Sequence, residues 1–292
     1  MNKFAKSLYE HFSQYLIILF LILASFNLIA QDSDESEYIE SVTIIGSKED
    51  LKNLAGSGAI ISNEDLQKAM DTDIQKILSA VPGLYMRTEE GYGLRPNISI
   101  RGTAIERSGK ITIMEVGVLV APAPYTASSA YYFPTTGRIH AVEVLKGPSA
   151  VPLGPQSIGG AINLISTPIP KVASGKFIQE IGENGMTRTH TYYGASQGNF
   201  GALVEIHEHA SDGYDSIANV GGDTGFDKSD LMIKANYTSG NHSLTFKRVD
   251  LDETSNQSYV GLSQASFNAN PRMRYGATAY DKMMNDGEQT SI

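Results

Sequence analysis

Two glycine-bounded apolar runs decide the fold: GLRPNISIRG at residues 93–102 and GPQSIGGAINLI at residues 154–165. Each is a short apolar alternation between glycines and prolines, a pattern that predicts a brief strand entered and left by a sharp turn. Two further strand-like runs lie between them, ITIME at 111–115 and AVEVLK at 141–146. The four runs predict a small mixed sheet that carries long, shaped loops. No nucleophile, base and orienting partner cluster in them, so they predict no active site.

The composition excludes several classes of protein. The chain has 292 residues, enough for about two domains, and a net charge of -9, which argues against a nucleic-acid partner because phosphate binding needs clustered Lys and Arg. Cysteine is absent, which excludes disulfide scaffolds, thiolate metal sites and cysteine nucleophiles. We also expect no catalytic residue, no metal site and no cofactor.

The N-terminus has the pattern of a targeting segment. Lys3 and Lys6 precede an apolar run at 16–26, which is shorter than the roughly 20 residues that span a bilayer. This predicts a secretory signal peptide over residues 1–30; a retained membrane anchor is the alternative, because Glu10 and His11 interrupt the basic region. No second long apolar run follows, so the exported part is expected to be either soluble or a membrane β-barrel.

A polar leader precedes the first regular structure. Residues 31–40 are acidic and without periodicity, which predicts disorder, and the β-branched run IESVTII follows at 39–45. An extended apolar segment after a flexible leader can add itself to the sheet edge of another protein; the alternative is the first strand of the next domain. Helices are predicted at 62–70, with Ser62 as N-cap, and at 73–80, which makes the region an α+β domain.

The period changes after residue 170. Runs at 176–182, 186–196, 199–210, 229–239 and 242–251 alternate over about ten residues, the length of a tilted membrane-spanning strand. In the third run Val204 and Ile206 share one face while Glu205, His207 and His209 share the other, as lipid and a wet lumen require. The connections at 197–199 and 239–241 are short, whereas 212–228 is long.

Five such strands cannot close around the preceding domain, so residues 171–292 are expected to begin an antiparallel β-barrel that is incomplete here. Residues 252–292 are polar and are expected to form an outer loop and its surroundings. His207 and His209 lie two apart on one strand face, which is a spacing that metal ligands use; a wet lumen wall is the favoured interpretation. Glu89 and Glu90 are interpreted as a solvated turn rather than an acid–base pair.

Taken together, these runs resemble the TonB-dependent outer-membrane receptors, and the ferric-dicitrate-receptor branch in particular. Residues 39–45 are similar to the TonB box, while 94–102 and 154–166 are similar to signatures of the plug domain. Residues 118–125 (VLVAPAPY) and 130–137 (AYYFPTTG) resemble plug loops of that branch, and 255–281 resembles an extracellular segment. Two residues depart from the family pattern: Val116 stands where aspartate is usual, and Leu153 where an aromatic residue is common. We expect these departures to disturb a buried hydrogen bond or a packing contact.

The resemblance implies a fold and a function. It implies a signal peptide at 1–30, a leader with the TonB box at 31–47, a plug at 48–170, and the first strands of a barrel, 22-stranded when complete, at 171–292. The receptor would lie in the outer membrane of a Gram-negative cell, embedded in its lipid, and would import a ferric chelate such as ferric citrate or a siderophore. TonB and its inner-membrane energising complex would pull on the box, which consists of Ile39, Glu40, Ser41, Val42, Thr43, Ile44 and Ile45.

Specific residues follow from this resemblance. Arg107 is the first choice for contact with an anionic ferric chelate, and Tyr125, Thr126 and Tyr131 are the expected hydrogen-bond donors. Structural roles in the plug are expected for Arg95, Arg101, Gly102, Gly154, Gly159 and Gly160. Arginines inside such plugs pair with carboxylates of the barrel wall, and Arg101 is expected to be buried and paired in this way.

Other functions remain open at this point. The same scaffold could import haem, cobalamin or an oligosaccharide. A secreted β-rich adhesin or other binding module is the alternative from another class, and it predicts no lipid-facing apolar band. A secreted hydrolase is a third, but the chain shows no coherent catalytic set.

Overall fold

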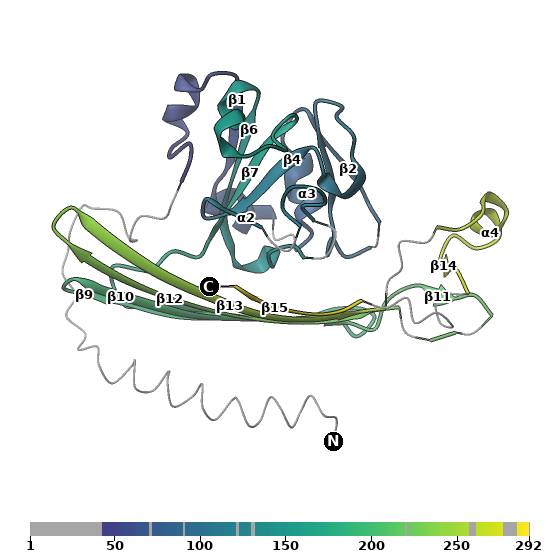
Figure 1. Ribbon diagram of the computed structural model, residues 1–292. Helices are drawn as coiled ribbons and strands as arrows, with labels where there is room; N and C mark the ends of the chain where they lie inside the picture. Colours follow the sequence, from purple (N-terminus) through teal and green to yellow (C-terminus); the bar gives the residue numbers. More distant parts are fainter. Residues whose placement is uncertain are drawn as a thin grey trace.

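The computed structural model contains two main sheets, one before and one after residue 170, where the spacing of apolar residues in the sequence changes. The structure describes residues 43–69, 72–89, 91–120, 123–129, 132–219, 221–222, 224–256, 261–276 and 285–291. The first sheet has five strands in the order β1-β6-β7-β4-β5 and belongs to an N-terminal unit; the second has six in the order β15-β13-β12-β10-β9-β8. Figure 1 shows the N-terminal unit on the inner side of the second, curved sheet, which we call the wall.

The five-stranded sheet is mixed, as predicted. Only β4 (Ile111–Glu115) and β7 (Gly160–Ser166) pair in parallel, whereas β6 (Ile139–Lys146) is antiparallel to β7 and to β1 (Ser57–Ile61). The short strand β5 (Val118–Leu119) closes one edge. The central strands bury nearly all of their side chains, so both faces of the sheet are covered.

Short helices and a two-stranded ribbon cover one face of this sheet. α2 (Asn63–Ala69) follows Ser62, whose hydroxyl accepts from the Asp65 amide while Asp65 accepts from the Ser62 amide, so the predicted cap is present. α3 (Ile74–Ser79) begins after Asp73, which accepts from the Gln75 amide at 2.8 Å. The ribbon consists of β2 (Leu84–Arg87) and β3 (Asn97–Ile100), and four short 3-10 helices complete the unit: η1 (Glu49–Asn53), η2 (Glu106–Ser108), η3 (Thr136–Arg138) and η4 (Pro148–Leu153).

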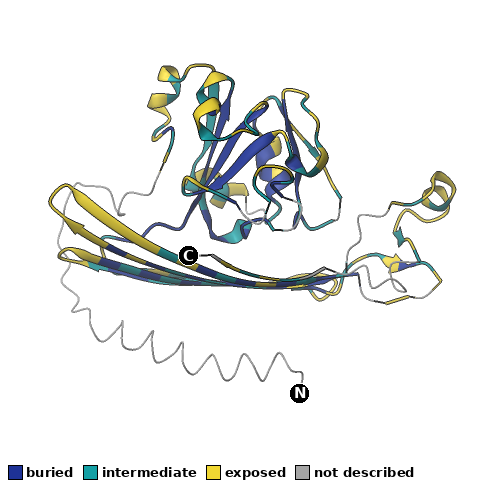
Figure 2. Cartoon of the chain, viewed as in Figure 1, coloured by how far each residue is buried: buried dark blue, intermediate teal, exposed yellow. Residues whose placement is uncertain are grey.

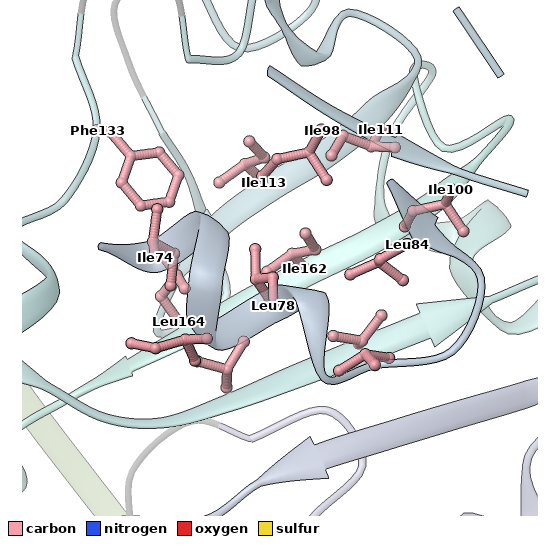
Figure 3. Packing of buried hydrophobic residues seen from close by; sticks show 14 of the residues in the cluster. Ile74, Leu78, Leu84, Ile98, Ile100, Ile111, Ile113, Phe133, Ile162 and Leu164 are labelled. Atoms are coloured by element: carbon pink, nitrogen blue, oxygen red, sulfur yellow. The ribbon is translucent and has the colours of Figure 1, made fainter. Parts of the chain in front are cut away.

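The two faces of the sheet bury separate apolar clusters. Ile74 and Leu78 of α3 pack with Ile98, Ile113 and Ile162 on one face (Figure 3). Since neighbouring residues of a strand point to opposite faces, the intervening positions lie on the other face, where Leu145 and Ala161 cluster with Ile45. That second face is therefore where the end of the predicted TonB box docks.

A two-residue turn, Val116-Gly117, joins β4 to β5 and shows what the valine at residue 116 costs. Val116 and Gly117 have φ values of 53° and 78°, the left-handed pair of a type I′ turn, which favours Asn-Gly or Asp-Gly. A β-branched residue is strained in this conformation. The Val116 amide still donates to the Leu164 carbonyl at 2.9 Å, and Leu153 packs partly buried against the second cluster. The cost at residue 116 is therefore local backbone strain.

Val116→Asn is expected to stabilise the N-terminal unit by about 1 kcal/mol, because asparagine tolerates the left-handed conformation that valine resists. The free energy of unfolding in urea measures this. Val118→Asn is the matched control, since Val118 is 70% exposed on the adjacent strand and should not gain stability. Equal effects at the two positions would argue against strain at residue 116.

Six strands form the wall. These are β8 (Ser174–Ile181), β9 (Thr187–Gln197), β10 (Phe200–Ser211), β12 (Phe226–Ser239), β13 (His242–Ser255) and β15 (Asn285–Ser291). All pairs are antiparallel, and the predicted tight turns contain Gly198 and Gly240 with φ values of 58° and 55°. The five predicted runs are thus strands, and together with the N-terminal unit they have the predicted fold of a plug followed by the start of a barrel.

The two faces of the wall differ in polarity, as predicted. On β10 and β12 the residues that face the N-terminal unit are buried and mostly polar, among them Glu205, His207, Asp230 and Lys234. Figure 2 shows this burial alternating along the strands under the N-terminal unit, while the turn ends remain exposed. Large apolar side chains such as Phe200 and Phe177 are exposed on the opposite face at 66% and 70%. This opposite face is therefore suited to lipid.

The expectation of an outer loop after residue 252 needs correction. β13 continues to Ser255, and β15 pairs with it from Val249 to Ser255, because Asp252 and Thr254 alternate with buried side chains on the same strand. Between them lie α4 (Gln264–Ala269) and β14 (Met273–Arg274), which pairs in parallel with β11 (Ser216–Ile217) of the long 212–228 connection. In Figure 1 these segments lie together at the right. Among the described residues, no helix is long and apolar enough to cross a membrane.

Candidate functional site

The contact between the N-terminal unit and the wall centres on Arg138, at the end of η3. Its side chain is fully buried and its Nε donates to Asp230 Oδ2 of β12 at 2.9 Å, while its two terminal nitrogens bind Glu115 of β4. Lys247 of β13 lies 2.5 Å from Glu115, and Thr135 donates to Asp230 at 2.6 Å. Two carboxylates from different sheets thus share one guanidinium, which locks the unit to the wall.

The carboxylate of Glu115 is held ionised by this network. Burial alone would raise the pKa of Glu115, but the charges of Arg138 and Lys247 outweigh burial and lower it to about 2. Glu115 therefore keeps its charge throughout the physiological pH range.

A second group of contacts joins the end of β7 to the wall. Lys234 Nζ donates to the carbonyls of Thr167 and Ser166 at 2.6 and 3.2 Å. The Thr167 hydroxyl donates to Glu205 at 2.8 Å, and Glu205 also lies 2.6 Å from His190 Nε2. The segment that links the two sheets is therefore fixed by Lys234 and Glu205 on the face of the wall toward the N-terminal unit.

The two arginines expected to have structural roles behave differently. Arg95 pairs with Glu253 of β13, which also lies 3.2 Å from Lys228, so it makes the expected contact with a wall carboxylate. The expected burial of Arg101 is wrong: Arg101 is exposed, and its guanidinium donates to Ser57 at 2.8 Å. Arg101 lies in a left-handed turn at the end of β3 opposite to Arg95, and the buried arginine at the wall is Arg138.

The predicted ligand residues Arg107, Tyr125 and Thr126 lie on two neighbouring loops. The loops are joined by the Ser108 and Ser129 hydroxyls, 2.9 Å apart. Tyr125 and Thr126 are exposed, and Arg107 is partly exposed; Tyr131 lies outside the described residues.

Arg107 is already paired with a carboxylate, that of Glu89. Its guanidinium lies 2.7 Å from the Glu89 carboxylate, which also accepts from Asn97 at 2.7 Å, and the Arg107 amide donates to Asn97 Oδ1 at 2.8 Å. Glu89, expected in a solvated turn, is therefore mostly buried and positions Arg107. An anionic ligand that bound Arg107 would compete with this carboxylate.

The comparison with known proteins identifies the N-terminal unit. The family model described as TonB-dependent Receptor Plug Domain matches residues 50–161. Residues 50–161 are a TonB-dependent receptor plug domain. We call the N-terminal unit the plug from here on.

Curated relatives and solved structures cover more of the chain. The "Iron-regulated outer membrane virulence protein" of Vibrio cholerae is 30% identical over 150 residues, which is 50% of this chain and 22% of the relative. "Vitamin B12 transporter BtuB" of Photobacterium profundum is 22% identical over 212 residues, 72% of this chain and 34% of the relative. The unliganded "ferric citrate transporter FecA" has a TM-score of 0.64 at 23% identity, covering 82% of this chain and 37% of that structure.

The "ferric yersiniabactin uptake receptor FyuA from Yersinia pestis" has a TM-score of 0.59 at 19% identity, covering 71% of this chain and 33% of that structure. These structures share the fold of plug and wall. This chain spans less than two fifths of the length of each of these four relatives.

Glycines of the plug signatures occupy positions that other residues would strain. Gly160 has φ 147°, and a Cβ there would lie 2.3 Å from the Leu145 carbonyl oxygen. A Cβ on Gly159 would lie 2.9 Å from the Thr103 hydroxyl. Gly102 and Gly154 also have positive φ, at 78° and 144°. Both signatures thus contain tight turns at the ends of plug strands.

His207 was interpreted as part of a wall exposed to water, but its side chain is buried against the plug. Its ring packs on Gly137, where an added Cβ would lie 2.0 Å from Nε2, and neither ring nitrogen has a hydrogen-bond partner in the described structure. His209 lies further along the strand, with ring centroids 6.2 Å apart. The described residues contain no group of three His, Cys, Asp or Glu that could hold a metal ion.

His140 lines a cavity of about 400 Å³ between plug and wall, together with Lys176, Arg188 and His190. Burial, reinforced by the positive charges of Lys234 and Lys176, lowers the pKa of His140 to about 4. Between pH 6.5 and 4 the unfolded chain binds a proton at this histidine that the native plug does not, so stability falls as the pH falls.

His140→Gln is therefore expected to make the plug less sensitive to acid. The loss of unfolding free energy between pH 7 and pH 4.5 should be smaller than in the wild type by on the order of 1–2 kcal/mol. Urea unfolding at both pH values measures it. Because carboxylates titrate equally in both proteins, the same loss in wild type and variant would contradict a neutral, partly buried His140.

Proposed function

We propose that this chain is the N-terminal part of an outer-membrane receptor of a Gram-negative cell, and that the receptor imports a ferric chelate. The observation that supports it most is the plug domain fixed on the charged face of a wall whose other face exposes large apolar side chains. Such an arrangement suits a gate inside a membrane pore. A receptor of this kind moves its ligand without changing it, so no catalytic residue is proposed.

The iron-containing ligand class is supported by the relatives. One is named as iron-regulated, and two solved structures are named for ferric citrate and ferric yersiniabactin. Ferric chelates of this type are anionic or rich in oxygen, so they suit a cation with neighbouring hydroxyls. We propose Arg107, Tyr125, Thr126 and Tyr131 as contacts, and a ferric citrate receptor of the FecA type as the specific form.

A vitamin B12 receptor is the second candidate, because a named relative transports that ligand. Binding to the purified full-length product of this gene distinguishes the two. We expect saturable binding of a ferric chelate, with ferric citrate tested first, and no competition by cobalamin or haem. Saturable binding of cobalamin without binding of any ferric chelate would reverse the assignment.

TonB and its inner-membrane complex are the proposed partners, with the box at residues 39–45 as the contact. Residues 39–42 lie outside the described part of the chain, as does the proposed signal peptide. The box is extended in the proposed complex, where its backbone would pair with a sheet edge of TonB. The proposed boundaries are a signal peptide at 1–30, a leader at 31–47, a plug at 48–170 and barrel strands from 171.

A further inference from the structure

The end of the proposed TonB box is bound by one carboxylate of the plug. The backbone amides of Ile44, Ile45 and Gly46 donate to Glu143 at 2.8, 2.8 and 3.1 Å, although Glu143 is almost 100 residues away in the sequence. Glu143 lies on β6 and is only 2% exposed. Three consecutive amides on one buried carboxylate make charge-assisted hydrogen bonds, the stronger kind.

The carboxylate is in turn connected to the middle of the sheet. Asn163 of β7 donates its side-chain amide to Glu143 Oε2 at 2.8 Å and accepts from the Gly117 amide at 2.9 Å, in the turn between β4 and β5. A continuous set of hydrogen bonds therefore runs from residues 44–46 through β6 and β7 to the end of β4. Ile45 adds an apolar contact, since it is 7% exposed and packs in the cluster of Leu145 and Ala161.

We propose that Glu143 is the anchor through which tension on the TonB box enters the plug. This inference rests on the proposed function for its role in transport, but the anchor itself can be measured without a ligand. Force applied before residue 44 reaches the first fixed point of the described chain at Glu143. From there Asn163 distributes it over the two strands that carry the plug sheet, rather than over a peripheral loop.

The geometry makes Glu143→Gln a sharp test. Each carboxylate oxygen receives two donors: Oε1 those of Ile45 and Gly46, Oε2 those of Ile44 and Asn163. A glutamine amide group must replace one oxygen by NH₂, so in either orientation two donors would face a donor. The side chain keeps its size, so the plug core is not emptied.

The experiment pulls the full-length receptor, held in a lipid bilayer, from a handle placed ahead of residue 39. Wild type should resist at a defined rupture force before any plug strand extends. Glu143→Gln should open this first contact at least about tenfold faster at the same force, because at least one charge-assisted hydrogen bond is lost. Glu64→Gln is the matched control, since Glu64 is exposed on α2, where it forms a surface ion pair with Lys68.

Two results would overturn the proposal. One is an unchanged rupture force in Glu143→Gln. The other is a weakened contact without loss of energised uptake of the chelate in cells, when chelate binding is that of the wild type. If the wild-type receptor binds no ferric chelate, the proposed function fails, while the pulling measurement still decides whether Glu143 is the anchor.

Discussion

Arg138→Leu is expected to lower the free energy of unfolding of the plug in the receptor by about 3 kcal/mol or more. The reason is that two buried carboxylates, those of Glu115 and Asp230, lose the cation they share. Glu115 and Asp230 would remain buried, at 8% and 1% exposure. Lys247 would compensate part of the charge on Glu115, and Thr135 would still donate to Asp230. This places the expected loss at the lower end of the range for broken buried pairs.

Urea unfolding of the plug in the purified receptor measures this loss, followed by a fluorescent label on the exposed α2. Arg138→Lys should lose less, since it keeps the charge but not the fork that reaches both carboxylates. Arg87→Leu is the control: its ion pair with Glu106 is on the surface, where such pairs contribute about 0–1 kcal/mol. Similar losses for Arg138→Leu and Arg87→Leu would contradict the role given to Arg138.

Val42→Pro is expected to abolish energised uptake while chelate binding at the outer loops is unchanged. Proline removes the amide of residue 42 and restricts the residue before it, so an extended box could no longer pair continuously with a sheet edge of TonB. Uptake of radiolabelled ferric chelate by cells, compared with binding to the purified receptor, separates the two effects.

The control for this variant lies in the leader, where Ser36→Pro precedes the box and removes no amide from the proposed pairing. It should import the chelate at the rate of the wild type. Wild-type uptake by Val42→Pro would show that residues 39–45 are not the energised contact.

Local patterns in the sequence predicted the local structure well. The helices α2 and α3, the cap of α2, the strands at 111–115 and in the region of 141–146, and the tight turns at 198 and 240 all depend on neighbouring residues. The two-faced wall follows from alternation over ten residues. The strands β1, β2 and β15 were not predicted, because they are short or polar and are fixed by pairing with β6, β3 and β13, which are distant in the sequence or come after a turn.

Contacts between distant residues could not be predicted in this way. Arg138 lies 92 residues from Asp230, and the run TGRIH around it has no periodicity that marks a buried arginine. The role of Glu143 could not be predicted either. In the sequence it is an ordinary polar residue of a strand, and only the structure places residues 44–46 beside it. Arg95 and Arg101 flank one strand, and only the position of the wall determines which of them it reaches.

Dependence of iron uptake on the proton-motive force tests the central claim most directly. Cells in which this gene supplies the only receptor for ferric chelates should accumulate radiolabelled iron from ferric citrate or another chelate. Accumulation should stop when a proton uncoupler is added, although surface binding persists. Uptake that continues at the same rate with the uncoupler, or the absence of uptake for every ferric chelate tested, would contradict the account.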